Sequence, residues 1–160
     1  MEKLNENIFH QYNKWKTGYV RKENSLQMRL NNFLTHFNAP KIYTKNFSIS
    51  EDGTCVNCTG DVFIYDENLI NGKLPLPFGK VDGEFDCSYC EKLTSLDGAP
   101  EEVGGDFSCV GCKSLKSFDG LPKKIEGYLI VDDKFKNKVP SYVKAEKGVL
   151  GMSEYNPIPF

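Results

Sequence analysis

The chain has 160 residues, of which 39% are hydrophobic and 12% aromatic, so it is expected to fold as one globular domain and is not an intrinsically disordered protein. Its 20 basic and 22 acidic side chains give a net charge of -2, which argues against bulk attraction to a polyanion such as a nucleic acid.

Apolar residues in the first segment, residues 1–41, recur at helical spacing. One stripe comprises Leu4, Ile8, Tyr12, Trp15 and Tyr19, and a second comprises Leu26, Leu30, Phe33, Leu34 and Phe37. Ser25 or Asn24 can cap the second helix, and Ala39-Pro40 ends it. The sequence therefore predicts a two-helix cap over the end of the fold that follows. The alternative role is a partner-binding helix pair anchored by Trp15 with Lys14 and Lys16.

In residues 42–59 apolar and polar side chains alternate, with a period of two residues. Phe47 and Ile49 alternate with polar residues, and Asp52-Gly53 then forms a turn signal before Thr54-Cys55-Val56. This pattern predicts a β-hairpin that leads into the next segment.

Residues 60–131 contain an internal repeat. VDGEFDCSYCEKLTSLDGAPEE is followed directly by VGGDFSCVGCKSLKSFDGLPKK, and ten positions are identical. A degenerate copy precedes them from Gly60, and Ile125-x-Gly127-x-Leu129-x-Val131 continues the pattern. A period of this length is typical of a solenoid, in which each unit buries its apolar side by stacking on its neighbours. We expect about four rungs in a mainly β, α+β domain.

The apolar and cysteine positions of the repeat, V-x-G-x-F-x-C-x-x-C-x-x-L-x-S-x-D-G-x-P, fit a leucine-rich pattern closed by Cys. On these residues the chain resembles the leucine-rich-repeat family, and more narrowly a Cys-bearing type found in bacteriophage and bacterial proteins. The resemblance implies a solenoid scaffold for binding and says little about activity.

Residues 132–160 depart from the pattern. Lys134 to Val143 are expected to form a short capping turn or helix, and Gly148-Val149-Leu150-Gly151 a last strand. The ending Asn156-Pro157-Ile158-Pro159-Phe160 is expected to be an exposed tail. All four segments belong to one structural domain.

Three Cys-x-x-Cys pairs allow two interpretations. Cys87, Cys90, Cys109 and Cys112 have the spacing of a zinc ribbon. The same cysteines recur at equal positions of the repeat, so the stacking of one repeat on the next would place them above one another as buried thiols. We favour this structural role and expect no cofactor. Disulfide or redox chemistry is a third possibility.

No catalytic signature occurs, so we expect a protein that is not an enzyme. Strand alternation predicts the side chains that point into the core: Val62, Ile64, Phe85, Cys87, Phe107, Cys109, Leu129 and Val131. Their neighbours would form an exposed acidic face with aromatic and aliphatic ends, which is either a solvated surface or a partner-binding site: Phe63, Tyr65, Glu84, Asp86, Asp106, Ser108, Tyr128 and Ile130.

Two further places are secondary candidates for partner binding. One is a basic corner that includes Lys123 and Lys124, and the other is Trp15 in the helical cap. No stretch approaches the ~20 apolar residues needed to span a bilayer, and the first residues lack the apolar core of a secretion signal. A cytoplasmic location is therefore expected, in the host cytoplasm if the chain is phage-encoded.

The leading hypothesis is a non-enzymatic protein-protein interaction module. It would be a phage or prophage accessory factor that binds, and inhibits or redirects, a host or defence protein. The alternatives are a virion structural component, in which self-association is possible, and a zinc-stabilised protein associated with nucleic acid.

Overall fold

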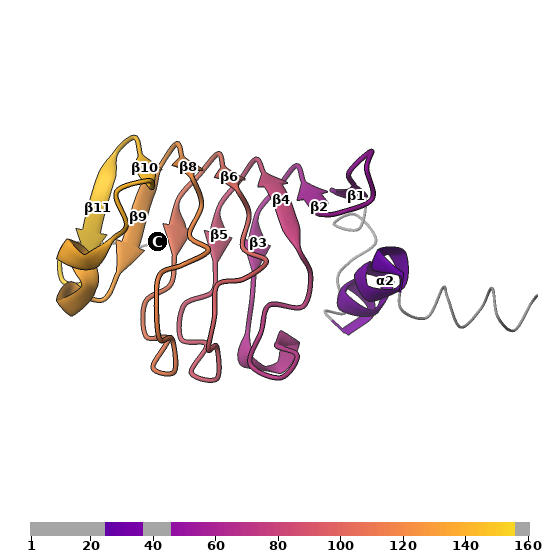
Figure 1. Cartoon of the computed structure of the whole chain (residues 1–160), viewed down its shortest axis with the longest axis horizontal. Helices are drawn as coiled ribbons and strands as arrows, with labels where there is room; N and C mark the ends of the chain where they lie inside the picture. The colour runs from indigo at the N-terminus through magenta and orange to yellow at the C-terminus, as the bar shows by residue number, and fades with distance from the viewer. Residues whose placement is uncertain (1–24, 37–45, 156–160) are drawn as a thin grey trace, which may run out of the picture.

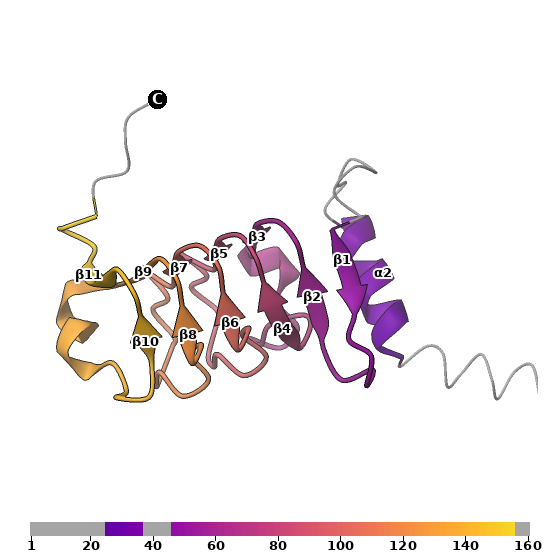
Figure 2. The ribbon, with the colours of Figure 1, turned by 90° about the horizontal axis from the view of Figure 1, so that it is seen from above.

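The chain forms a β-solenoid of about four stacked turns, in which several cysteines contribute to the core (Figure 1). The computed structural model describes residues 25–36 and 46–155. Each turn contributes one short strand to each of two sheets. In Figure 2 the two sheets run side by side along the length of the molecule.

The six-stranded sheet has the order β1-β2-β4-β6-β8-β10. Its members are β1 (Phe47–Ile49), β2 (Val56–Cys58), β4 (Phe78–Val81), β6 (Glu102–Val103), β8 (Lys124–Ile125) and β10 (Lys144–Ala145). The β1 and β2 strands pair antiparallel through the predicted hairpin, in which Gly53 has a φ of 73°. The other pairs of this sheet are parallel.

The five-stranded sheet has the order β11-β9-β7-β5-β3 and is parallel throughout. Its members are β3 (Val62–Phe63), β5 (Phe85–Asp86), β7 (Phe107–Ser108), β9 (Tyr128–Val131) and β11 (Gly148–Gly151). Two 3-10 helices, η1 (Asp66–Asn68) and η2 (Asp133–Lys138), lie in the connections. The β10 and β11 strands extend both ladders beyond Val131.

The repeat determines the register of the ladders. Phe85 pairs with Phe107, and Phe107 pairs with Leu129, so residues at equivalent repeat positions lie above one another. The rings of Phe85 and Phe107 are stacked, with centroids 5.3 Å apart and an angle of 5° between their planes. Such columns let identical side chains bury one another, which is why the repeat can form a core from short strands.

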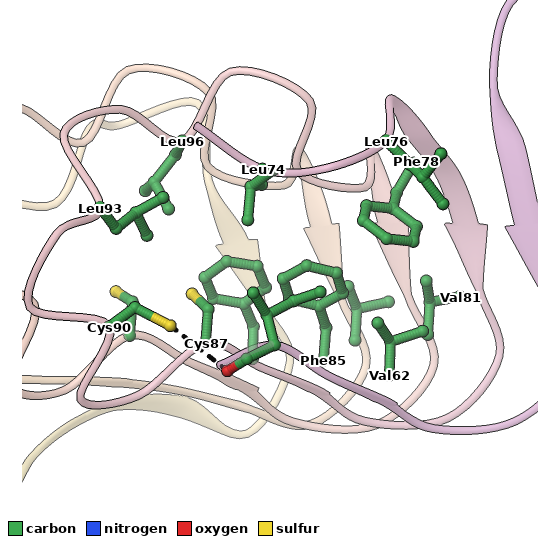
Figure 3. Packing of buried hydrophobic residues seen from close by; sticks show 14 of the residues in the cluster. Val62, Leu74, Leu76, Phe78, Val81, Phe85, Cys87, Cys90, Leu93 and Leu96 are labelled. Atoms are coloured by element: carbon green, nitrogen blue, oxygen red, sulfur yellow. Dashed lines mark hydrogen bonds between the residues drawn. The ribbon is translucent and has the colours of Figure 1, made fainter. Parts of the chain in front are cut away.

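The core lies between the two sheets and the long connections (Figure 3). All eight side chains predicted to point inward are buried, which confirms the alternation on the inner face. Leu93 and Leu96 in the connection that follows β5 are also fully buried. The leucine positions of the repeat therefore close the side of the core that the sheets leave open.

Glycines occupy the corner between the two sheets, where successive turns approach closely. A Cβ atom on Gly105 would lie 2.9 Å from the backbone N of Glu84 and 2.9 Å from the carbonyl C of Gly83. The equivalent Gly127 would place a Cβ atom 2.7 Å from the carbonyl C of Gly105. The recurring glycine of the repeat is thus a packing requirement of the corner.

One α-helix is described, α2 (Leu26–His36), and it confirms the second predicted stripe. The Ser25 hydroxyl accepts a hydrogen bond from the Met28 N–H at 3.3 Å, as expected of an N-cap. Phe33 packs against Phe47 and Phe78, with ring centroids 5.9 and 6.1 Å apart, so α2 covers the N-terminal end of the solenoid. The first predicted helix lies outside the described residues, and the two-helix form of the cap is not confirmed.

Among the residues described, no helix combines the length and apolar character that a bilayer crossing requires.

Candidate functional site

The outer face of the five-stranded sheet carries most of the predicted partner-binding residues. Phe63 is 43% exposed and Tyr65 is 53% exposed. Glu84, Asp86, Asp106 and Tyr128 are half-buried on the same face, and the Lys147 ammonium lies 5.7 Å from the centroid of the Tyr128 ring. These six residues therefore have the outward orientation that strand alternation predicts.

The prediction that Ile130 is exposed is wrong, because this side chain is fully buried. Its strand neighbour Ser108, also predicted to be exposed, is only 6% exposed. The segment that follows β11, up to Tyr155, projects on the side of the five-stranded sheet (Figure 2). Met152 and Tyr155, which follow β11, line the same groove as Ser108.

A groove of about 410 Å³ lies on the uncovered part of the outer face. Its lining comes from the first three turns and from the segment after β11: Phe63, Ile64, Tyr65, Glu84, Asp86, Ser88, Tyr89, Ser108, Val110, Met152 and Tyr155. We call this surface the outer-face groove. It brings together five residues predicted for this face, Phe63, Tyr65, Glu84, Asp86 and Ser108. Asp106, Tyr128 and Ile130 are not part of its lining.

Most of the carboxylates near the groove are engaged by backbone N–H groups. Asp61 accepts a hydrogen bond from the Glu84 N–H at 2.8 Å, and Asp106 accepts one from the Tyr128 N–H at 2.7 Å. Asp86 accepts one from the Ser88 N–H at 2.8 Å. These bonds give Asp61, Asp86 and Asp106 a structural role in joining or turning the strands.

Glu84 differs from the aspartates at its repeat position. It occupies the place held by Asp61 in the turn before and by Asp106 in the turn after. Its longer side chain makes no hydrogen bond or ion pair with any described residue. Partial burial raises the pKa of the Glu84 carboxyl above its ordinary value. The negative charges of Asp86, Asp106 and Asp61 raise it further, each by a smaller amount.

Tyr155 lies close to the same carboxylates. Burial raises the pKa of its hydroxyl, and the charges of Glu84, Asp106 and Asp86 raise it further. The groove is thus a region of uncompensated negative charge with aromatic walls. Such a surface is suited to a ligand that carries positive charge and apolar area.

Sequence reasoning missed five residues of the groove: Ser88, Tyr89, Val110, Met152 and Tyr155. Tyr89 is 61% exposed and has a φ of 59°, a conformation that L-residues rarely adopt. The only available signal was its alignment with Gly111 in the repeat, which marks a tight turn. Met152 and Tyr155 lie beyond the repeat, and no pattern in the sequence places them over the sheet.

The predicted basic corner is partly neutralised by neighbouring turns. Lys123 forms an ion pair with Glu101 at 3.4 Å, and Lys124 lies 3.0 Å from Glu126 and 4.0 Å from Glu146. These exposed pairs reduce the positive potential available to an anionic partner. Trp15, the other secondary candidate, lies outside the described residues.

The second cysteine of each of the two clear repeats, Cys90 and Cys112, donates a hydrogen bond to the turn before. Cys90 Sγ donates to the Ile64 carbonyl oxygen at 3.3 Å (dashed line in Figure 3), and Cys112 Sγ donates to the Cys87 carbonyl oxygen at 3.1 Å. The two bonds are equivalent in successive turns. Each thiol therefore satisfies a buried carbonyl group while filling a small space in the core.

The environment favours the protonated form of Cys87, Cys90 and Cys109, whereas a hydrogen bond with Cys87 lowers the pKa of the Cys112 thiol. Burial raises the pKa of Cys90 to about 12. The neighbouring Cys112 thiol and complete burial raise the pKa of Cys87, and burial raises the pKa of Cys109. A zinc ligand must be a thiolate. Across residues 25–36 and 46–155, no group of three or more Cys, His, Asp or Glu side chains is arranged to hold a metal ion.

Comparison of the chain with protein-family models, curated proteins and solved structures finds no match. The geometry of the chain itself is therefore the basis for its functional interpretation.

Proposed function

We propose that this chain is a non-enzymatic protein-protein interaction module and that the outer-face groove is its contact surface. The observation that carries the proposal is the exposure of Phe63, Tyr65 and Tyr89 beside the Glu84 carboxylate in one groove. Exposed aromatic residues next to uncompensated charge are typical of binding surfaces, because the rings offer apolar area at low entropic cost.

The proposal includes the narrower identity that the repeat suggests. Its Cys-bearing, leucine-rich pattern supports a scaffold of the bacteriophage and bacterial type, acting in the host cytoplasm as an accessory factor. Its partner would be a host or defence protein that it inhibits or redirects.

Site-specific photo-crosslinking tests the position of the contact surface. A photo-reactive phenylalanine analogue at Tyr65 is compared with the same analogue at Tyr142, which is 44% exposed and lies outside the groove. Crosslinking is carried out in bacterial host lysate, and the products are identified by mass spectrometry. We expect one dominant protein to be crosslinked from position 65 and not from position 142.

A double variant, Phe63→Ala with Tyr65→Ala, provides the matched binding test. Tagged wild-type protein should retain the crosslinked partner, and the double variant should lose it, while Tyr142→Ala retains it. Equal retention by all three proteins, or crosslinking from position 142 alone, would refute the groove as the contact surface.

A further inference from the structure

The outer-face groove combines a carboxylate that has no counter-ion with aromatic side chains on both sides. Phe63 and Tyr65 come from the first turn, Glu84 and Tyr89 from the second, and Tyr155 from the segment after β11. We infer that this groove binds an arginine side chain on an extended segment of the partner, with the Glu84 carboxylate as counter-ion. The inference rests on the proposed function and names the chemistry that the partner must present.

The charge of the groove is not balanced within the described part of the chain. None of the ion pairs found there involves Glu84, Asp86 or Asp106. Asp86 and Asp106 are already engaged by backbone N–H groups, so Glu84 is the carboxylate most available to a ligand. Charge complementarity therefore requires a cation, and it places the cation at Glu84.

The lining favours an organic cation over a metal ion. The described residues include no set of three or more acidic, histidine or cysteine side chains with metal-binding geometry. Aromatic walls instead attract a cation through the faces of their rings. Among protein side chains, arginine fits this lining best, because its planar guanidinium stacks on rings and donates two parallel hydrogen bonds to one carboxylate.

The shape of the groove favours an extended segment. Its lining crosses three successive turns, from Tyr65 through Ser88 to Val110. Strands in a sheet are about 4.8 Å apart, so the crossing spans roughly 10 Å, the length of about three extended residues. A volume of about 410 Å³ accommodates one large side chain and the backbone beside it.

NMR titration with single-residue probes tests the inference. The probes are Nα-acetyl-arginine amide, Nα-acetyl-lysine amide and Nα-acetyl-norleucine amide, added to the full-length, 15N-labelled protein. We expect the arginine probe to give saturable shifts confined to the groove, the lysine probe to bind more weakly, and the norleucine probe not to bind. On saturation with the arginine probe, the pKa of the Glu84 carboxyl should fall.

Glu84→Gln removes the counter-ion and keeps the size of the side chain. It should weaken binding of the arginine probe about tenfold or more, the effect of losing a charge-assisted hydrogen bond. Glu51→Gln, which changes an exposed glutamate outside the groove, is the control and should bind like wild type. Saturable shifts outside the groove, equal binding by Glu84→Gln, equal binding of the lysine probe, or no shift at the solubility limit would each overturn the inference.

The outcome is separable from that of the proposed function. Crosslinking from position 65 together with a failed arginine titration would leave the interaction surface standing and refute only the arginine. Failure of both experiments would refute both.

Discussion

The Tyr89 ring covers the α-carbon of Gly111, the residue at the equivalent position in the next turn. A Cβ atom on Gly111 would lie 2.6 Å from Cδ1 of Tyr89, and the two residues have positive φ values of 59° and 70°. The turn geometry recurs in both coils, but only one coil uses the residue type that tolerates it. An exposed aromatic residue kept in an unfavourable conformation at the wall of a groove suggests selection for function.

We expect Tyr89→Gly to separate stability from binding. Relief of the positive φ favours the variant by roughly 1–2 kcal/mol, while loss of the ring contacts opposes it. Because the ring is 61% exposed, the free energy of unfolding should change by less than about 1 kcal/mol, whereas partner capture should be lost. Urea denaturation and the capture assay measure the two effects. A loss of more than about 2 kcal/mol would show that the ring has mainly a structural role.

Glycine at the corner between the sheets should be replaceable only in the first turn. In Gly105→Ala the new methyl group meets the backbone of Gly83 and Glu84, which cannot move without disturbing the ladder. We expect a loss of about 1–3 kcal/mol in unfolding free energy. The control is Gly60→Ala, where the nearest atom is the side-chain nitrogen of Asn46 at 3.0 Å and can rotate away. Equal melting temperatures for the two variants would contradict this account of the corner.

Glu84 should reduce stability at neutral pH. Because its pKa is raised in the folded state, the folded protein retains this proton to a higher pH than the unfolded chain. Stability is therefore lost as the pH rises from the unfolded pKa, about 4.3, through the folded pKa. Glu84→Gln cannot ionise, so it should be more stable than wild type at pH 7, and the difference should shrink towards pH 4. Thermal melting from pH 4 to pH 8 measures this, with Glu51→Gln as the control.

The six cysteines should differ sharply in reactivity. Cys55 is partly exposed, and the other five are buried. A thiol-specific disulfide reagent at pH 7.5 should modify Cys55 in the native protein and all six only after unfolding. Rapid native modification of more than one thiol would contradict the ladder geometry. Peptide mapping identifies the modified residue.

Alkaline pH should destabilise the same core. Buried thiols with raised pKa values stay protonated in the folded protein after they ionise in the unfolded chain. Each such thiol lowers the free energy of unfolding by at most about 1.4 kcal/mol per pH unit above the unfolded pKa of about 8.5. Denaturation curves from pH 8 to pH 11 should show this loss, and Cys109→Ala should show a smaller slope. An unchanged slope in the variant would contradict this explanation.

The sequence alone was enough to predict the solenoid, the hairpin, the second helix and the inward-facing columns. Each of these features follows from a periodic pattern of residues along the chain. The repeat sets the register of the strands, and alternation within a strand then points the side chains of Phe85, Cys87 and their equivalents into the core. It was also enough to predict the outward direction of Phe63 and Tyr65. The spacing of the cysteines alone could not distinguish a zinc site from a ladder of buried thiols. A zinc ribbon and a stacked repeat both place Cys-x-x-Cys pairs at this separation.

Only the tertiary structure decided which outward residues line one groove. Ile130 has the alternation of an exposed residue, yet its side chain is fully buried in the folded chain. Tyr89 lines the groove from a turn in which its φ is positive, and Tyr155 lines it from the segment after the repeat. Neither feature follows from a periodic pattern in the sequence. Periodicity is a property of neighbours in the chain, whereas a groove depends on contacts between segments far apart in it, and these exist only once the coils have stacked.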